Sequence, residues 1–100
     1  MPAFSHYARV VVNPARGLEF IRVMQKVAED SRRETGCLGF VLLKSAHETQ
    51  TYCISSIWQS QMAWVAHTAT EQFGDQEIFM NGTGILSVVY TEEYYVMESV

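Results

Sequence analysis

The chain has few of the features that mark nucleic-acid-binding, membrane or secreted proteins. Its seven Lys and Arg residues are scattered among eleven Asp and Glu residues, which gives a net charge of −4. Only Arg32 and Arg33 are adjacent, so the sequence predicts no basic patch and no nucleic-acid partner. No apolar run approaches the roughly 18 residues that span a bilayer, and no secretory leader pattern opens the sequence. We therefore expect a cytoplasmic protein without a membrane partner.

Cysteine is also scarce, and the two cysteines are not expected to form a disulfide. If residues 37–45 and 51–58 form a hairpin, Ser45 lies opposite Thr51 and Leu43 opposite Cys53. Cys37 is then about 20 Å further along its strand at ~3.3 Å per residue. This exceeds the ~7 Å that a bridge can span between Cα atoms. Two free thiols are typical of a reducing compartment.

What is present is enough for one domain, which we place over residues 1–100. Aromatic and β-branched runs predict strands, and apolar residues at helical spacing predict helices. Gly36 is placed to end the first helix, Ser60 to cap the second, and Asn81-Gly82 to end the third. The final strand is either one bulged strand or two short ones around Thr91-Glu92. The predicted strands cover residues 4–13, 37–45, 51–58 and 84–99, and the predicted helices 17–35, 61–68 and 71–80.

The order β-α-β-β-α-β, with its last helix divided, is the ferredoxin-like arrangement of an α+β fold. Residues 37–45 are apolar on both predicted faces: Leu38, Phe40 and Leu42 on one, Val41 and Leu43 on the other. So short a chain has too few helices to cover both faces of an antiparallel sheet. The simplest way to bury the second face is to pair it with the sheet of a second copy, which predicts a homodimer joined through its sheets.

An ordered set of motifs resembles the antibiotic biosynthesis monooxygenase family. Members share Glu-x-Gly-Cys near a second strand, Glu-x-Trp at the end of a third, and Ala-(apolar)-x-x-His on the next helix. The residues here that fall on this pattern are Glu34, Gly36, Cys37, Trp58, Ala63, Trp64 and His67. The resemblance implies a dimeric α+β barrel built from two ferredoxin-like subunits. Its better-known members oxidise anthrones, quinols and related aromatics with molecular oxygen and without metal, flavin or haem.

The sequence departs from the family pattern at one position, because Ser56 stands where the Glu of Glu-x-Trp is usual. The charge of that carboxylate is therefore missing. A haem-degrading branch of the same superfamily uses a helix tryptophan followed by a haem-ligating histidine. Here the corresponding positions hold His67 and Glu77, which argues against haem degradation.

His67 is the candidate general base, since a neutral imidazole in a pocket can accept a phenolic proton near pH 7. The alternative is a structural histidine bonded to a neighbouring carbonyl. On a helical wheel, Ala63, Trp64 and His67 oppose a second apolar side that contains Met62 and Val65. The resemblance turns the side with His67 toward the sheet.

Further residues are expected to bind the substrate. Trp58 and Trp64 could stack on an aromatic ring, although core packing is the more common role of a tryptophan such as Trp58. Tyr52, Ser56 and Trp58 share one strand face, and His6 joins the pocket if the first strand turns the same face to the helices. The candidate substrate-binding residues are therefore Trp58, Trp64, Ser56, Tyr52 and His6, with His67 catalytic, no metal ligand and no cofactor.

The leading hypothesis is a cofactor-independent monooxygenase that oxidises a small anthrone- or quinol-like aromatic. Two alternatives stay open. One is a non-catalytic dimeric barrel that binds a small apolar ligand, and the other is an isomerase on the same scaffold. The position of His67 relative to a cavity distinguishes a catalytic from a structural role.

Overall fold

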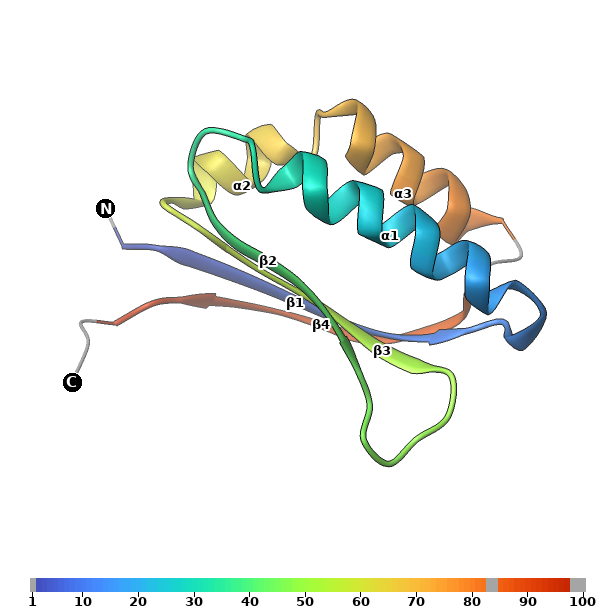
Figure 1. Ribbon diagram of the computed structural model, residues 1–100. Coiled ribbons are helices and arrows are strands. Elements are labelled where there is room, and N and C mark those ends of the chain that lie inside the picture. The colour runs from blue at the N-terminus through green and yellow to red at the C-terminus, as the bar shows by residue number, and fades with distance from the viewer. Residues whose placement is uncertain (1, 83–84, 98–100) are drawn as a thin grey trace.

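The chain folds into one antiparallel sheet covered on one face by helices, in a computed structural model that describes residues 2–82 and 85–97 (Figure 1). The four strands lie in the order β2-β3-β1-β4, with every neighbouring pair antiparallel. The strands are β1 (Phe4–Val12), β2 (Cys37–Lys44), β3 (Thr51–Trp58) and β4 (Ile85–Tyr95). The helices are α1 (Gly17–Ser31), α2 (Gln61–His67) and α3 (Glu71–Asn81), with a 3-10 turn over Pro14–Arg16. This is the predicted α+β ferredoxin-like fold, with the last helix divided.

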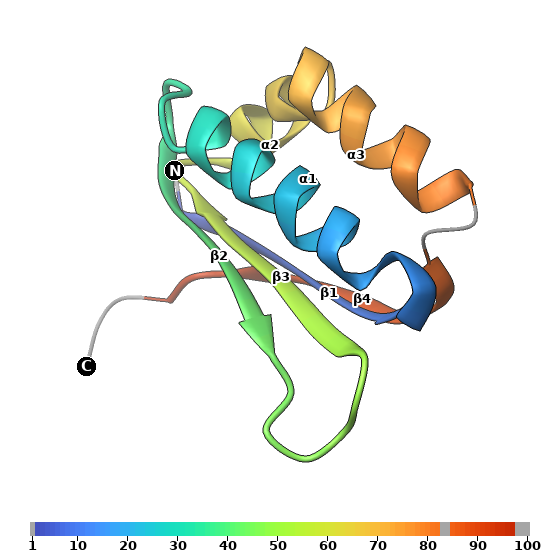
Figure 2. The same ribbon diagram turned by 45° about the vertical axis from the view of Figure 1, so that its right-hand side comes forward.

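All three helices lie on the same face of the sheet, as the turned view shows (Figure 2). The core fills the space between them because β1 and β3 alternate, so that every second side chain faces the helices. Phe20 and Met24 of α1 meet Val10 and Val12 of β1 there, all of them almost fully buried. No helix among the described residues is long and apolar enough to cross a membrane.

The end of α1 differs slightly from the prediction. The helix stops at Ser31, four residues before the expected end at Thr35, and a tight turn carries the chain to Gly36. Arg32, which caps the helix, donates two hydrogen bonds from its guanidinium to the carbonyl of Phe40 on β2. Gly36 has φ +90°, the left-handed conformation that glycine adopts at little cost.

The prediction of which residues share a face of β2 is wrong at the start of the strand. Cys37 pairs with Trp58 and Gly39 with Ile57, so one extra residue is inserted at Leu38. This bulge turns Cys37 inward and leaves Leu38 55% exposed, away from the buried Phe40. Leu43 opposes Cys53 as predicted, and both cysteines are free.

The predicted last strand forms as a single element, β4, within the part that the structure describes. Its irregularities lie opposite Arg9/Val10 and Val11/Val12 of β1, not around Thr91-Glu92. Residues 84, 98 and 99 of the predicted strand lie outside the described residues.

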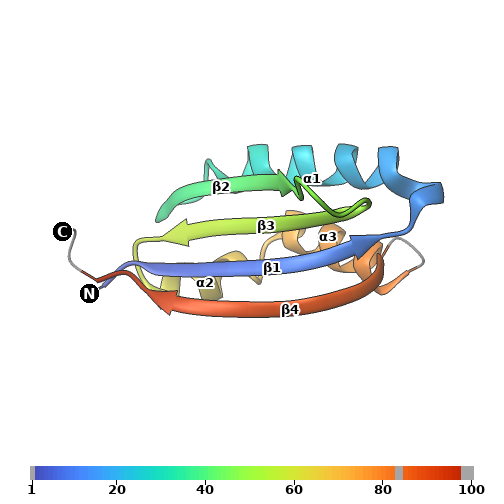
Figure 3. The same ribbon diagram turned by 90° about the horizontal axis from the view of Figure 1, so that it is seen from below.

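No helix of the described residues lies on the second face of the sheet, and all four strands can be followed across it (Figure 3). Large apolar side chains remain exposed there within this chain. They include Val41 and Leu43 of β2 and Tyr90 and Tyr94 of β4. The prediction that two helical segments and α1 could not cover both faces is therefore correct for the single chain.

Candidate functional site

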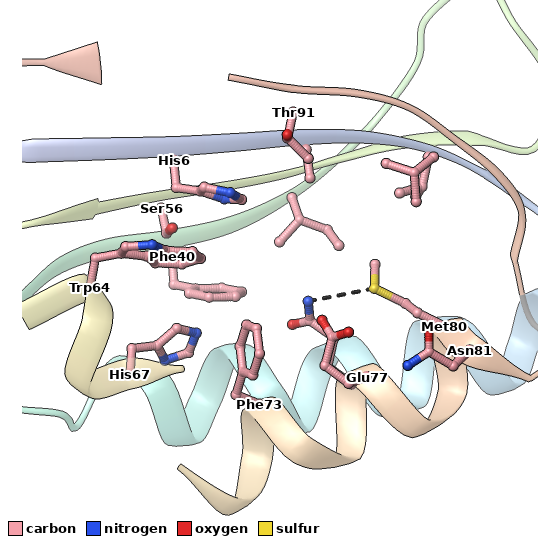
Figure 4. A pocket seen from close by; sticks show the side chains of 15 residues that line it. His6, Phe40, Ser56, Trp64, His67, Phe73, Glu77, Met80, Asn81 and Thr91 are labelled. Carbon is pink, nitrogen blue, oxygen red and sulfur yellow. Dashed lines mark hydrogen bonds between the residues drawn. The ribbon is translucent and has the colours of Figure 1, made fainter. Parts of the chain in front are cut away.

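A cavity of about 260 Å³ lies between the helix-facing side of the sheet and helices α2 and α3 (Figure 4). Its sheet wall includes His6 of β1, Phe40 of β2 and Ser56 of β3. Its helix wall includes Trp64 and His67 of α2 and Phe73 of α3. The same face of α3 contributes further polar groups, Gln76, Glu77 and Asn81. The cavity therefore has an aromatic part near α2 and a polar part along α3.

His67 is held in one orientation by a carboxylate. Its Nδ1 lies 2.6 Å from Oε2 of Glu34, and the Nε2 amide of Gln72 donates to the same oxygen at 2.9 Å. A carboxylate can only accept, so Nδ1 donates its proton to Glu34. In the neutral imidazole, Nε2 is then the proton acceptor. His67 is only 1% exposed, and it lines the cavity.

The pairing depends on the close approach of two segments that are far apart in sequence. A Cβ atom at Gly36 would lie 2.8 Å from the Cβ of Ala63 on α2, so only glycine fits. The Gln59 amide also donates to the Gly36 carbonyl at 2.8 Å. This contact brings the turn that carries Glu34 against the helix that carries His67.

Two capping residues fix the ends of the short helix that carries His67. The Ser60 hydroxyl accepts from the Ala63 amide at the start of α2. The Thr70 hydroxyl donates to the His67 carbonyl at 2.7 Å and accepts from the Phe73 amide at the start of α3. Thr70 therefore joins the end of one helix to the beginning of the next, and this places His67 and Phe73 side by side.

Aromatic rings surround the imidazole. The ring centroids of Trp58, Phe73, Trp64 and Phe40 lie 4.6, 5.3, 5.4 and 5.8 Å from that of His67. Such rings exclude water and leave Glu34 as the polar partner that orients the imidazole. A neutral imidazole in such surroundings can accept a proton from a ligand in the cavity.

His6 forms a second imidazole position in the cavity wall. Its ring stacks on Trp64 with centroids 4.0 Å apart and planes 15° apart. Burial lowers the pKa of His6 below its ordinary value, and the nearby His67 lowers it further, while Glu93 acts in the opposite direction. His6 is therefore neutral near pH 7 and can donate or accept a hydrogen bond.

Comparisons with known sequences and structures identify the family to which the chain belongs. Residues 3–76 match the sequence model of the antibiotic biosynthesis monooxygenase family. The chain belongs to this family. No curated protein matches the chain.

Solved structures of similar proteins share the fold over nearly the whole chain. A candidate antibiotic biosynthesis monooxygenase from Caulobacter crescentus is 26% identical with a TM-score of 0.87, covering 97% of this chain and 92% of its own. A protein from Pseudomonas aeruginosa is 21% identical with a TM-score of 0.85, covering 97% and 96%. A candidate family member from Nitrosomonas europaea is 16% identical with a TM-score of 0.85, covering 94% and 98%.

Two parts of the antibiotic biosynthesis monooxygenase pattern form one structural unit here. Glu34 supplies the carboxylate that bonds the imidazole of His67. Gly36, which has no Cβ, leaves the space that the Cβ of Ala63 on α2 needs. The spacing of the motif therefore corresponds to a packing contact and a hydrogen bond. Ser56, which replaces the usual family carboxylate, is buried and lines the cavity between its strand neighbours His6 and Phe40.

The predicted substrate-binding residues separate into two groups. His6, Ser56 and Trp64 line the cavity together with His67. Trp58 lies behind His67 in the core with no exposed surface, and its indole N–H has no hydrogen-bond partner among the described residues. Tyr52 packs against Phe20 and lines a separate groove beside α1. The side of α2 that the family resemblance turns toward the sheet is the correct one, because His67 is buried while Met62 and Val65 are exposed.

Other residues of the site were not recognised as site residues from the sequence. Glu34 was part of the motif, but its partner became visible only once the turn at Gly36 met α2. Phe73, Gln76, Glu77 and Met80 follow the spacing i, i+3, i+4 and i+7, which predicts one face of a helix. No group of three or more His, Cys, Asp or Glu side chains among the described residues is arranged to hold a metal ion.

Proposed function

We propose that the protein is a monooxygenase that oxidises a small electron-rich aromatic compound with molecular oxygen and without a cofactor. The observation that supports this most is the position of His67, which lines an aromatic cavity and is oriented by Glu34. Family membership supports a monooxygenase-like activity in general. The anthrone- or quinol-like substrate and the role of His67 are the proposal.

Proton removal is the first step. The substrate's phenolic O–H, or the C–H beside its carbonyl, donates its proton to Nε2 of His67, and Glu34 stabilises the resulting imidazolium through Nδ1. A general base of this kind contributes roughly 10²–10⁴-fold to rate. Because the surrounding rings exclude water, the charge pair formed in the cavity interacts strongly.

The electron-rich anion then reduces oxygen itself. One electron passes to O₂, and the substrate radical combines with superoxide to form a peroxide anion on carbon. The peroxide recovers the proton from His67. Its O–O bond then breaks while the same carbon loses its remaining hydrogen, so that a C=O bond forms and water leaves. For a carbon that carries two hydrogens the sum is R₂CH₂ + O₂ → R₂C=O + H₂O, in which one oxygen atom enters the product.

Among the proposed substrates, the size and lining of the cavity favour quinols of one or two rings over the three-ring anthrones. Its volume of about 260 Å³ lies just below the roughly 300–1,000 Å³ of ordinary ligand pockets. Trp64, Phe40 and Phe73 offer ring faces and edges to a flat aromatic ligand.

Ser56 supports a second candidate function, a binding protein for a small aromatic ligand. Without the usual family carboxylate the cavity keeps its aromatic lining but has one acid fewer. In that case the wild-type protein binds quinols and does not consume oxygen with them.

The test is oxygen consumption with a panel of anthrones and quinols, comparing the wild type with His67→Gln and Glu34→Gln. His67→Gln is expected to lower kcat/KM by roughly 10²–10⁴-fold, and Glu34→Gln to lower it by less, since an amide oxygen still accepts from Nδ1. His47→Gln is the matched control, because His47 is exposed in the loop between β2 and β3. Activity that survives in His67→Gln would contradict the role of this residue, and no uptake with any substrate would contradict the reaction.

We propose in addition that a second copy of the chain covers the open sheet face, giving the dimeric barrel that the family resemblance implies. The face exposes Val41 and Leu43 on the edge strand β2 and Tyr90 and Tyr94 on the opposite edge strand β4, and apolar side chains gathered on one exposed face commonly mark a protein–protein interface. Sedimentation at micromolar concentration is expected to show a dimer, and Leu43→Lys is expected to shift it toward monomer. A stable wild-type monomer would refute this arrangement.

A further inference from the structure

Helix α3 presents to the cavity one face with a polar group in its centre. Phe73, Gln76, Glu77 and Met80 of this helix all line the cavity. Figure 4 shows Trp64, His6 and His67 toward one end, Glu77, Met80 and Asn81 toward the other, and Phe73 between them. Glu77, Met80 and Asn81 thus lie beyond Phe73 as seen from the imidazole (Figure 4).

Gln76 is the unusual member of this face. Its side chain is buried, with 8% of the residue exposed, and its Oε1 has no hydrogen-bond partner among the described residues. Its Nε2 donates only to the thioether sulfur of Met80 at 3.7 Å, a weak acceptor, drawn as the dashed line in Figure 4. Leaving a buried amide oxygen unpaired is unfavourable. Gln72, one turn earlier, has its amide fixed on Glu34.

The surroundings restrict what can satisfy Gln76. Glu77 lies beside it in the cavity wall, and neither Lys nor Arg is among the described residues that line the cavity. An anionic group would meet the Glu77 carboxylate without a compensating cation. A neutral hydroxyl can donate to Oε1 and also tolerate the carboxylate, because both oxygens accept.

We propose that Gln76 is a specificity-determining residue, whose Oε1 accepts a hydrogen bond from a hydroxyl group on the substrate ring at the end away from His67. The cavity then selects dihydroxylated aromatics over their methoxy and carboxy analogues. This proposal deepens the proposed function. It depends on that function only in its statement that the end of the ligand near His67 is the end that reacts. Binding at Gln76 itself requires no oxygen chemistry.

The experiment measures binding in the absence of oxygen, by quenching of tryptophan fluorescence. The ligands are 1,5-dihydroxynaphthalene, 5-methoxy-1-naphthol and 5-hydroxy-1-naphthoic acid. We expect the wild type to bind the diol roughly 5- to 150-fold more tightly than the methoxy compound, and the acid most weakly. In Gln76→Leu this preference falls to within about twofold. Gln25→Leu, which changes an exposed glutamine on α1, keeps the preference.

A second measurement needs no variant and covers the case in which Gln76→Leu does not fold. In the wild type, the side-chain carbonyl ¹³C signal of Gln76 is expected to shift with the diol and to shift far less with the methoxy compound. A wild type that binds both compounds equally, a preference that persists in folded Gln76→Leu, an unmoved Gln76 signal, or no binding of any of the ligands would each overturn the proposal. Oxygen uptake decides the proposed function separately, since the diol preference can hold in a protein that consumes no oxygen.

Discussion

Gly36→Ala tests whether the contact between the turn and α2 holds the site together. The substitution has two separable costs. Alanine at φ +90° loses about 1–2 kcal/mol because its Cβ crowds the backbone in the left-handed region. The new Cβ also lies 2.8 Å from that of Ala63, well inside the ~3.5–4.0 Å of a favourable carbon contact, and overpacking of this kind costs about 1–3 kcal/mol. The sum is about 2–5 kcal/mol.

The double variant separates these two costs. Ala63→Gly alone is expected to cost about 1 kcal/mol, because glycine is a poor helix residue in α2. In Gly36→Ala/Ala63→Gly the crowding is relieved and only the backbone and helix costs remain, about 2–3 kcal/mol together. The two substitutions therefore interact by about 1–3 kcal/mol, which a double-mutant cycle resolves.

The assay is urea unfolding followed by circular dichroism, with oxygen uptake measured on each folded variant. Gly36→Ala is also expected to lower activity, because the displaced turn carries Glu34 away from His67. A loss of less than about 0.5 kcal/mol in Gly36→Ala, or strict additivity in the double variant, would refute the reasoning.

Three further predictions follow from the same contacts. Trp58→Phe is expected to cost less than about 1.5 kcal/mol of unfolding free energy, because it removes a buried N–H without a partner among the described residues. Trp58→Ala is expected to cost about 3–5 kcal/mol. Equal losses of the two variants in thermal unfolding would contradict this. Thr70→Ala is expected to lower the unfolding free energy by about 1 kcal/mol and Thr70→Ser by much less, since the serine hydroxyl still caps α3. The lowered folded-state pKa of His6 means that the unfolded state binds its proton first as the pH falls. Stability from this group is thus present above pH ~6.5 and lost as the pH falls through the folded-state pKa, so His6→Phe, which keeps the ring on Trp64, should lose less stability between pH 7.5 and 5.5 than the wild type.

Most of the fold could be predicted because local signals and the global arrangement agree. The turn at Gly36, the cap at Ser60 and the pairing of Leu43 with Cys53 all follow from residue type and spacing. The bulge at Leu38 could not be read, since a one-residue shift depends on how the strand meets its neighbour. The end of α1 at Ser31 is likewise not marked by residue type, since Arg32, Arg33 and Glu34, which follow it, are all good helix formers.

The site was predictable in part for the same reason. His67, Trp64, Ser56 and His6 reach one cavity because strand alternation and a family motif fix the direction of their side chains. Glu34 and His67 are 33 positions apart in sequence, and no periodic pattern of residues predicts the hydrogen bond between them. Trp58 and Tyr52 share the strand face of Ser56 but lie beyond the ends of the cavity, under α2 and α1, so that the face alone did not determine contact with a ligand.

The most direct measurement of the central claim is isotope incorporation from ¹⁸O₂ during turnover of the best quinol or anthrone. The proposed reaction places one labelled oxygen atom in the product and the other in water. Mass spectrometry is expected to show a singly labelled product with the wild type and with His47→Gln, and loss of that product with His67→Gln. A product that takes its oxygen from solvent, or labelled product formed equally by His67→Gln, would contradict the account.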